Sequence, residues 1–392
     1  MIHNMNVGGT EKSLLSLISV LRKEYYEVTV LMLEARGGYL KDIPKWVNVI
    51  VLKDYEKIKP IIFLPPIISL KKEILNLKFV KAFHIFNSYV KAKYTNNWVY
   101  FYEYALKKYP RLQPEYDLAI AYAGPSDFIT YFTVNKIKAL KKIQWIHFDI
   151  SKLKINKKFG DKYYDFFSEI LCVSHSSADN MRKKYPRFKE KINVFENIIL
   201  KDEIYKLVDK GDSYDDDFKG VRICTLGRLS HEKGQFMIPI IVKRLKDLGY
   251  KFRWYCIGEG ELRKRIESDI EKFDIKNELI LLGLQKNPYR FLKDTNIYVQ
   301  TSLHEGYGLT MREAKIINIP MVVTNVASAP EIIENGKTGL IVDVDEDSLF
   351  KGIRKMLDEE QLLSSIKRNL IRESKLENNT NINSKINRLL LQ

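Results

Sequence analysis

The fold class follows from residues 221–234, which read VRICTLGRLSHEKG. The apolar run 221–226 ends at a glycine and predicts a buried strand, and a helix is expected from 234 to about 248. The same order of strand, loop and helix recurs at 252–257 followed by 261–273. Repeated strand–helix units predict parallel sheets with helices on both faces, and therefore an α/β protein.

This alternation extends over most of the chain and indicates two domains, because its 392 residues exceed the roughly 250–300 that one core usually holds. We interpret the acidic, turn-prone segment 209–217 as the linker. We place the N-terminal domain at 1–203, the C-terminal domain at 204–370, and a final helix at 371–392 that packs back on the N-terminal domain. A helix is also expected at 10–21, and further strands at 28–33, 48–52, 118–121, 142–146, 170–173, 279–282, 297–300, 321–324 and 339–342.

Residues 55–115 interrupt the alternation and are rich in lysine and aromatic residues, so we expect a helical insert in the N-terminal domain. The net charge is +16 and the pI about 9.3, which favours anionic partners unless the lysines only solvate the surface. The insert can contact an anionic membrane, or it can be a packed insertion with solvated lysines. Nucleic acid is disfavoured as a partner, because no RNA- or DNA-reading motif accompanies the charge.

The three cysteines, Cys172, Cys224 and Cys256, each lie in an apolar stretch, and no two have the spacing of metal ligands. We expect buried free thiols in a reducing compartment, not a disulfide scaffold. No secretory signal opens the chain, and the longest apolar run, 60–70, is too short to span a bilayer. The sequence therefore predicts a cytoplasmic protein that is soluble or lies on a membrane surface.

The strongest functional signal is the stretch 302–314, SLHEGYGLTMREA, which follows a predicted strand and opens a helix. Gly306 and Gly308 let the backbone approach a ligand closely, and the free N–H groups at the helix start suit an anion such as a diphosphate. Glu305 lies on the loop and Glu313 in the helix. One of these carboxylates can face a cleft, while the other accepts hydrogen bonds from a pair of ribose hydroxyl groups. The alternative is a glutamate-capped surface helix.

A second signal is the loop 227–234, which also joins a strand to a helix. Arg228 offers a planar fork of donors and Lys233 a point charge, and two fixed cations stabilise a departing diphosphate as its charge builds. A basic surface loop is the alternative. A weaker signal is the glycine pair before the first helix, where Gly9 can contact a phosphate or sugar, although paired glycines also form plain turns.

Taken together, these segments resemble family 4 of the retaining glycosyltransferases over nearly the whole chain. The resemblance rests on Glu305 with Glu313, on the loop 227–234 and on the segment 335–342. It implies a GT-B fold, in which two Rossmann-like parallel-sheet domains face each other across a cleft. The first domain would bind the acceptor and the second a nucleotide diphosphate sugar, with retention of the anomeric configuration and no required metal or other cofactor.

The resemblance also assigns roles to individual residues. Arg228 and Lys233 would bind the diphosphate, Glu313 the ribose and Glu305 the transferred sugar, while the backbone near Leu284 would border the nucleobase. His147, at a predicted strand end, resembles the interdomain histidine that contacts the sugar near the reacting centre; a hydrogen-bonded core histidine is the alternative. Glu305 and His147 are thus the predicted catalytic residues, and the donor site is completed by Gly9, Gly306, Tyr307, Gly308 and Leu309.

Two departures from the family pattern bear on these expectations. The chain begins almost at the glycine loop, so the first strand of the N-terminal domain is expected to be missing. Residues 326–331 lack the glycines that often precede Pro-Glu-Ile in the family, which leaves the identity of the donor sugar open.

The predicted function is transfer of a hexose or N-acetylhexosamine from a nucleotide diphosphate sugar, with UDP favoured, to a lipid-linked saccharide acceptor. The resemblance implies same-face attack, in which the departing phosphate helps to take the acceptor's proton. Such a hexosyltransferase would serve bacterial cell-surface polysaccharide or glycoconjugate synthesis, as a peripheral protein on the inner face of the cell membrane. The alternative is a catalytically silent partner or chaperone subunit with the same fold, against which the intact motif residues argue.

Overall fold

The structure is a computed structural model of the 392-residue chain, and it describes all residues except 64–65, 96, 108, 153–154, 377–381 and 392. The chain divides into two compact units. Unit 1 comprises Met1–Asn197 with Asn383–Gln392, and unit 2 comprises Ile198–Ile382. Both units are built around parallel strands, as the strand–helix alternation of the sequence predicts.

Unit 2 contains a six-stranded parallel sheet in the order β12-β11-β10-β7-β8-β9. The first strand of the unit, β7, lies in the middle, and the strand order reverses between β7 and β10. Ligands of open α/β sheets bind beside such a reversal, at the carboxyl ends of the strands. The strands are β7 (Val221–Leu226), β8 (Phe252–Ile257), β9 (Leu279–Gly283), β10 (Ile297–Gln300), β11 (Met321–Thr324) and β12 (Leu340–Val342).

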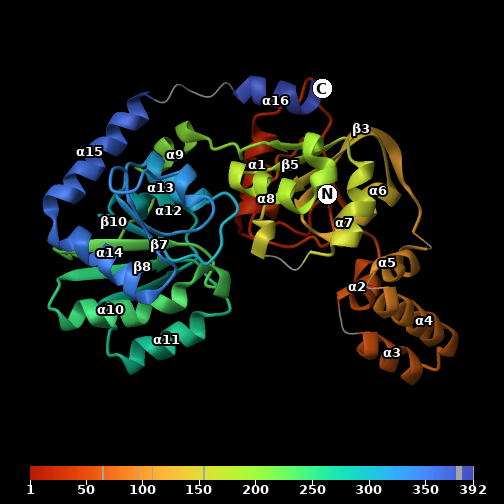
Figure 1. Cartoon of the computed structure of the whole chain (residues 1–392), viewed down its shortest axis with the longest axis horizontal. Helices are drawn as coiled ribbons and strands as arrows, with labels where there is room; N and C mark the ends of the chain where they lie inside the picture. The colour runs from red at the N-terminus through yellow and green to blue at the C-terminus, as the bar shows by residue number, and fades with distance from the viewer. Residues whose placement is uncertain (64–65, 96, 108, 153–154, 377–381, 392) are drawn as a thin grey trace. The chain divides into compact units, whose positions relative to one another are not determined.

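Helices cover both faces of this sheet (Figure 1). Successive residues of β10 point to opposite faces: Val299 joins a core with α10, α11, α14 and α15, and Tyr298 joins a core with α9, α12 and α13. In α10, the buried residues Ile238, Ile241 and Leu245 have the spacing of one helical face. The helices are α9 (Lys201–Leu207), α10 (Ile238–Asp247), α11 (Arg263–Lys272), α12 (Pro288–Lys293), α13 (Leu309–Ile316), α14 (Glu346–Asp358) and α15 (Glu360–Leu376).

Unit 1 contains two groups of parallel strands, β1 paired with β2, and four strands in the order β3-β4-β5-β6. Residues 1–3 lie between the two groups, because Tyr122 N donates to the Met1 carbonyl and Ile2 forms a bridge with Met32. This segment occupies the place at which the first strand was expected to be missing. The strands are β1 (Thr29–Met32), β2 (Asn48–Val51), β3 (Leu112–Gly124), β4 (Ile137–Ile146), β5 (Glu169–Cys172) and β6 (Ile192–Val194).

Four helices, α2–α5, follow β2 and correspond to the insert predicted at 55–115, although its last residues already belong to β3; we call them the helical arm. Ile58 of α2, Ile85 of α4 and Phe101 of α5 pack in one core with Phe128 of α6. The arm is thus packed on unit 1, and α3 and α4 form its outer hairpin (Figure 1). The helices of unit 1 are α1 (Gly9–Ser19), α2 (Tyr55–Phe63), α3 (Pro66–Leu75), α4 (Phe79–Thr95), α5 (Val99–Leu106), α6 (Asp127–Lys136), α7 (Lys157–Tyr163), α8 (His175–Lys184) and α16 (Ile382–Leu391).

The acidic segment 209–217 is part of unit 2, so its interpretation as a linker was wrong; the units divide at Asn197–Ile198, upstream of the predicted boundary between 203 and 204. Asp216 accepts hydrogen bonds from Arg222 at 2.7 Å and from Arg253 at 2.9 Å, and Tyr255 also donates to it. Burial raises the pKa of Asp216, but these bonds outweigh it and hold the pKa well below its usual range.

The predicted final helix at 371–392 is divided between the units. Residues 371–376 end α15 in unit 2, whereas Asn383–Gln392 belongs to unit 1, where Lys385 Nζ lies 3.3 Å from Glu196 Oε2. All three cysteines are buried free thiols, as predicted. Within the described part of the chain, no helix has both the length and the apolar character needed to cross a membrane.

Candidate functional site

The loops that follow β7 and β10 lie side by side at the carboxyl edge of the unit 2 sheet, beside the reversal of strand order. Leu303 N donates to the Glu232 carbonyl at 2.8 Å, and Thr301 Oγ1 donates to the Lys233 carbonyl at 2.8 Å. Gly234 has φ +69°, and a Cβ there would lie 2.0 Å from the Thr301 carbonyl oxygen. Contact between the two loops therefore depends on a glycine at this position.

These loops bring together Lys233 and Glu305, which the sequence assigned to different parts of one ligand. Lys233 Nζ lies 2.5 Å from Glu305 Oε1, which also accepts hydrogen bonds from Ser302 Oγ at 2.8 Å and Gln300 Nε2 at 3.0 Å. The Glu305 side chain is 9% exposed and that of Lys233 is 25% exposed. A largely buried ion pair with further hydrogen bonds is thus fixed at the edge of the sheet.

Gln300 and Ser302 are site residues that the sequence reasoning missed. Both are buried, and Gln300 Nε2 also donates to Ser302 Oγ at 2.6 Å. Thr310 donates to Gln300 Oε1 at 3.2 Å, and Tyr298 donates to the same oxygen. The available signal was a glutamine at the end of the otherwise apolar strand β10, because a buried amide needs polar partners.

Arg228 lies on the same loop as Lys233 but faces solvent. Its side chain is 58% exposed, and Nη1 lies 3.8 Å from Glu232 Oε1. An ion pair this exposed contributes little to stability. The guanidinium is therefore a solvent-facing cation on the β7 loop, and binding of an anion would not require a strong contact to be broken.

The segment 305–313 leads from the β10 loop into α13. Gly308 precedes α13 with φ +69°, and a Cβ there would lie 2.4 Å from Met311 Cε. Gly306 and Tyr307 are buried, and the Arg312 guanidinium lies 4.2 Å from the centre of the Tyr307 ring. Leu309 is the first residue of α13, so the N–H groups of this turn lack carbonyl partners within the helix.

Glu313 lies on α13, and Leu284 follows the edge strand β9 of the same unit. Glu313 is buried on α13, where Tyr289 of α12 donates to its Oε1 at 3.1 Å; Tyr289 was also missed from the sequence. Leu284 follows β9 at the carboxyl edge of the same sheet and is exposed. The carboxylate of Glu313 is therefore held in place by Tyr289, whereas the apolar side chain of Leu284 is exposed at the surface.

Gly9 and His147 belong to unit 1. Gly9 is the first residue of α1, and apart from its chain neighbours and the α1 backbone no described atom lies within 4 Å of a Cβ built on it, so packing does not require glycine there. His147 follows β4 and is buried beside Tyr122 and Trp145, with ring centres 4.6 and 5.8 Å away. The Tyr122 hydroxyl lies 2.9 Å from Ser13 Oγ of α1, which connects the two regions.

His147 is a core histidine with one unsatisfied nitrogen. Burial lowers its pKa to about 3, although a hydrogen bond with the Tyr122 backbone raises it. In the part of the chain that the structure describes, Nε2 has no hydrogen-bond partner. The imidazole is therefore neutral at pH 7 and a poor general base, and its Nε2 is buried in the structure as it stands.

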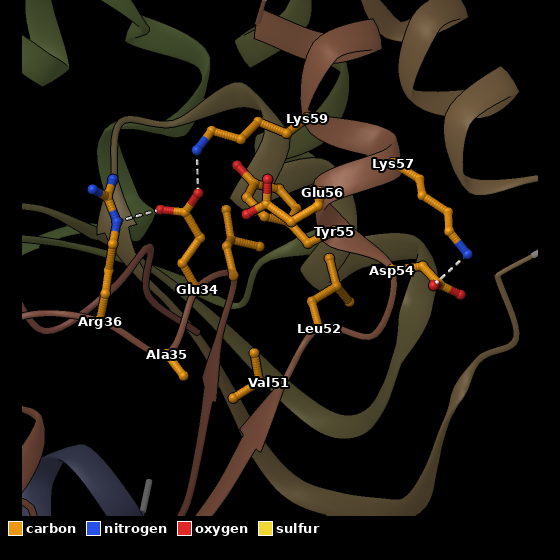
Figure 2. A pocket seen from close by; sticks show the side chains of 11 residues that line it. Glu34, Ala35, Arg36, Val51, Leu52, Asp54, Tyr55, Glu56, Lys57 and Lys59 are labelled. Atoms are coloured by element: carbon orange, nitrogen blue, oxygen red, sulfur yellow. Dashed lines mark hydrogen bonds and ion pairs between the residues drawn. The ribbon is translucent and has the colours of Figure 1, made fainter.

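Unit 1 also contains a cavity of about 650 Å³ at the carboxyl ends of β1 and β2, which the sequence did not predict (Figure 2). In it, Glu34 accepts hydrogen bonds from Arg36 Nε at 2.5 Å and from Lys59 of α2. The bonds from Lys59 and Arg36 outweigh burial and lower the pKa of Glu34. The rest of the lining is both charged and apolar: Leu33, Ala35, Val51, Leu52, Asp54, Tyr55, Glu56 and Lys57.

Comparison with known proteins matches residues 215–373 to the family of glycosyl transferases group 1. An uncharacterised glycosyltransferase of Methanocaldococcus jannaschii is 29% identical over 176 residues, which are 44% of this chain and 43% of that protein. N-acetylgalactosamine-N,N'-diacetylbacillosaminyl-diphospho-undecaprenol 4-alpha-N-acetylgalactosaminyltransferase of Campylobacter jejuni is 25% identical over 215 residues, 54% of this chain and 57% of that protein. The chain thus spans about half the length of these relatives.

Among solved structures, HepE of Anabaena in complex with UDP and glucose superposes with a TM-score of 0.69. The superposition covers 100% of this chain and 99% of HepE, at 15% sequence identity, so the likeness concerns the fold. This chain therefore has the GT-B fold of two Rossmann-like units, and its residues 215–373 match the glycosyl transferases of group 1.

Proposed function

We propose that this protein is a retaining family 4 glycosyltransferase, which moves a hexose or N-acetylhexosamine from a UDP-sugar to a saccharide acceptor. The observation that carries the proposal is the Lys233–Glu305 pair, 2.5 Å apart beside the reversal of strand order and next to the start of α13. Cations, a helix N-terminus and carboxylates at one sheet edge suit a ligand that combines a diphosphate with hydroxyl groups.

In this proposal, Arg228, Lys233 and the first N–H groups of α13 bind the diphosphate. The backbone from Gly306 to Leu309 lines the same side of the ligand. The Lys233 ammonium has three donors, so it can hold Glu305 and still reach a phosphate oxygen. Negative charge grows on the diphosphate as its bond to the sugar breaks, and fixed cations stabilise that state most. The proposal involves no metal ion.

The nucleoside and the sugar are assigned to neighbouring groups. Glu313, oriented by Tyr289, would accept hydrogen bonds from the ribose hydroxyls. Leu284 is exposed and would cover one face of the uracil ring. Glu305 would accept from hydroxyls of the transferred sugar, while Gln300 holds its carboxylate in place.

The transfer would retain the anomeric configuration. The acceptor hydroxyl attacks the anomeric carbon on the face from which the diphosphate departs, and a phosphate oxygen takes the hydroxyl proton. One C–O bond breaks and one forms, so no other reactant is needed. In unit 1, neutral His147 would form a hydrogen bond with a sugar hydroxyl through Nε2, which requires a shift of the side chains that now bury this atom, and Gly9 would leave room for the donor.

We place the acceptor saccharide in the cavity of unit 1. Glu34, Arg36 and Lys59 offer donors and acceptors for hydroxyl groups, beside the apolar side chains of Leu33 and Leu52. The Campylobacter relative is named for a diphospho-undecaprenol substrate, which supports a lipid-linked acceptor. The protein would then act in bacterial cell-surface polysaccharide or glycoconjugate synthesis, in the cytoplasm at the inner face of the cell membrane.

A thermal-unfolding screen with UDP, GDP, ADP and dTDP tests the donor site. We expect UDP at about 100 times its Kd to add about 2.7 kcal/mol of stability, because it binds only the folded chain. The other nucleotides should stabilise less at the same concentration. Equal stabilisation by all four would remove the assignment of UDP, and no stabilisation by any of them would remove the nucleotide site.

The Arg228→Ala variant separates an enzyme from a silent partner subunit. We expect UDP-sugar turnover, with or without acceptor, to fall at least tenfold, while the melting temperature without nucleotide stays unchanged because Arg228 is exposed. Lys264→Ala, which removes an exposed cation of α11, is the control. If wild type and Arg228→Ala are equally inert with every nucleotide sugar, the silent-partner alternative is favoured.

A further inference from the structure

The outer hairpin of the helical arm, residues 66–95, concentrates exposed apolar side chains. Of the 24 large hydrophobic side chains that are exposed in the described part of the chain, 11 lie in this segment. They are Ile67, Ile68, Ile74, Leu75, Leu77, Phe79, Val80, Phe83, Phe86, Val90 and Tyr94. Scattered apolar residues are normal on a protein surface, but a contiguous set marks an interaction site.

Helix α4 carries two apolar stripes, and only one of them has a partner in the fold. Ala82, Ile85 and Ala92 are buried, at the spacing of the helix face that packs on unit 1. Phe79, Phe83, Phe86, Val90 and Tyr94 follow one another at intervals of three or four residues, so they form a second stripe, and all five are exposed. Packing of the unit therefore explains the first stripe and leaves the second one without a role.

The hairpin is also strongly cationic. Residues 66–95 include six lysines (Lys71, Lys72, Lys78, Lys81, Lys91 and Lys93) and one acidic residue, Glu73. Lys81 Nζ lies 3.5 Å from Glu73 Oε1, and the Glu73 side chain is 15% exposed. The one negative charge is thus neutralised, and the surface around the apolar stripe is positive.

We propose that the α3–α4 hairpin is a docking surface for an anionic lipid bilayer. Phenylalanine, leucine and isoleucine side chains would enter the boundary between headgroups and acyl chains, while the lysines contact lipid phosphates. A second copy of the chain fits this surface poorly, because it would bring two sets of lysines face to face. An anionic bilayer supplies both the apolar medium and the opposite charge.

This inference rests on unit 1 alone and can fail without affecting the proposed sugar transfer. It nevertheless gives the proposed acceptor a physical setting. Tyr55, the first residue of α2, lines the cavity in which we place the acceptor saccharide, and α2 packs on the hairpin through α3. Docking of the hairpin would bring the cavity close to a saccharide carried on a membrane lipid.

Co-sedimentation of the full chain with vesicles tests the proposal. Vesicles of phosphatidylcholine with about one third phosphatidylglycerol should bind the protein, and pure phosphatidylcholine vesicles should bind at least tenfold less, because each lysine near an anionic surface changes partitioning about fivefold. Binding should weaken as salt rises. Equal binding to both kinds of vesicle, or no binding to either, would overturn the proposal.

Substitution of the exposed apolar stripe of α4 provides a second test. The triple variant Phe79→Ser, Phe83→Ser, Phe86→Ser should bind anionic vesicles at least tenfold less than wild type. The matched control is Tyr25→Ser, Leu140→Ser, Phe166→Ser, which removes three exposed apolar side chains elsewhere in unit 1. Unchanged binding by the first variant, or loss by both, would contradict the docking surface. A wild-type dimer that becomes monomeric in the first variant would assign the surface to a second copy.

A labelling experiment keeps the test valid if the triple variant does not fold. The three native cysteines are buried, so a single new cysteine on the surface can be labelled selectively with an environment-sensitive fluorophore. A label at Leu75→Cys, which is 83% exposed in the native chain, should shift to the blue on addition of anionic vesicles. The same label at Leu140→Cys should not shift. Identical responses at both positions would reject docking through the hairpin.

Discussion

Each unit holds a carboxylate paired with a lysine at the carboxyl edge of its strands, but the two pairs are supported differently. Glu305 bonds to Lys233, Ser302 and Gln300, and these groups lie on two adjacent loops and on the strand β10. Glu34 bonds to Arg36, two residues away, and to Lys59 of the helical arm. The sheet itself fixes the pair in unit 2, whereas the pair in unit 1 depends on an inserted helix.

This difference agrees with the roles that we propose for the two units. A nucleotide diphosphate has a constant shape and charge, and it is bound best by groups held on rigid strands and loops. Acceptor saccharides vary, and a cavity lined in part by an inserted arm can change without disturbing the sheet. The four predictions below test whether the two edges differ in rigidity, charge and ligand.

The largest expected effect comes from Lys233→Ala. It should lower kcat/KM for the donor about 10²- to 10³-fold, because it removes a cation from the diphosphate and leaves Glu305 without its ion pair. We also expect a loss of about 1–3 kcal/mol of stability, measured by urea denaturation. Lys59→Ala removes the corresponding lysine in unit 1, which is 41% exposed, and should cost less than about 1 kcal/mol. Equal losses in the two variants would contradict the difference in support.

The second prediction concerns the effect of pH on stability through the buried, neutral His147 of unit 1. The folded pKa of His147 is about 3, below its ordinary 6.5, so between these values only the unfolded chain binds the proton. The contribution of His147 to stability is therefore complete above pH 6.5 and falls by up to about 1.4 kcal/mol per pH unit as the pH decreases. Denaturation at pH 7.5, 6.0 and 5.0 should show a shallower decline in His147→Phe than in wild type. His304→Phe, at an exposed position in unit 2, is the control, and parallel curves for wild type and His147→Phe would refute the prediction.

The third prediction compares two glycines at helix starts. Gly308→Ala should destabilise unit 2 by about 1–3 kcal/mol, because its φ is +69° and the new Cβ would lie 2.4 Å from Met311. Gly9→Ala should leave stability within about 0.5 kcal/mol, because the space around it is open, while it weakens donor binding. Melting temperatures and UDP-sugar affinities measure both effects. A destabilised Gly9→Ala would show that packing also fixes the glycine of unit 1.

The smallest expected effect tests the acceptor cavity. Glu34→Gln should raise KM for the saccharide acceptor about tenfold and leave KM for the donor unchanged, because it removes a charge-assisted acceptor of hydrogen bonds in unit 1. Initial rates with each substrate varied in turn give the two constants. Glu24→Gln, at an exposed position of the same unit, should change neither constant. A raised donor KM in Glu34→Gln would assign the cavity to the donor.

Much of unit 2 was predictable because its strands are short apolar runs between glycine and polar loops. The strands 221–226, 252–257 and 297–300 have the predicted bounds, since burial on both faces leaves little ambiguity in such sequences. Residues 137–141 of β4 were not predicted, because the lysines at 138 and 141 interrupt the apolar pattern. The local sequence pattern thus predicts strands that are buried throughout, but it misses strand segments that are partly exposed.

The errors and omissions at the site have a different origin, which is contact between residues far apart in the chain. We interpreted Asp216 as part of an acidic linker, but its partners Arg253 and Tyr255 come from β8. The predicted roles of Lys233 and Glu305 separated two groups that adjacent loops join. The cavity of unit 1 could not be found for the same reason, because Lys59 and Glu34 are 25 residues apart in the sequence and meet only in the folded unit. Sequence motifs identify the residues of a site, whereas the contacts between those residues depend on the order of strands in the sheet.

The close approach of Gly234 to Thr301 has a consequence for the design of chimeras. The loop 227–234 and the loop 301–308 are joined by the bonds Leu303–Glu232 and Thr301–Lys233, and Gly234 leaves no room for a side chain against Thr301. If only one loop is replaced by that of a relative, the new loop will therefore not fit the native loop that it contacts. Reprogramming of the donor sugar should exchange the two segments as one cassette, in which the sequence between them can stay native.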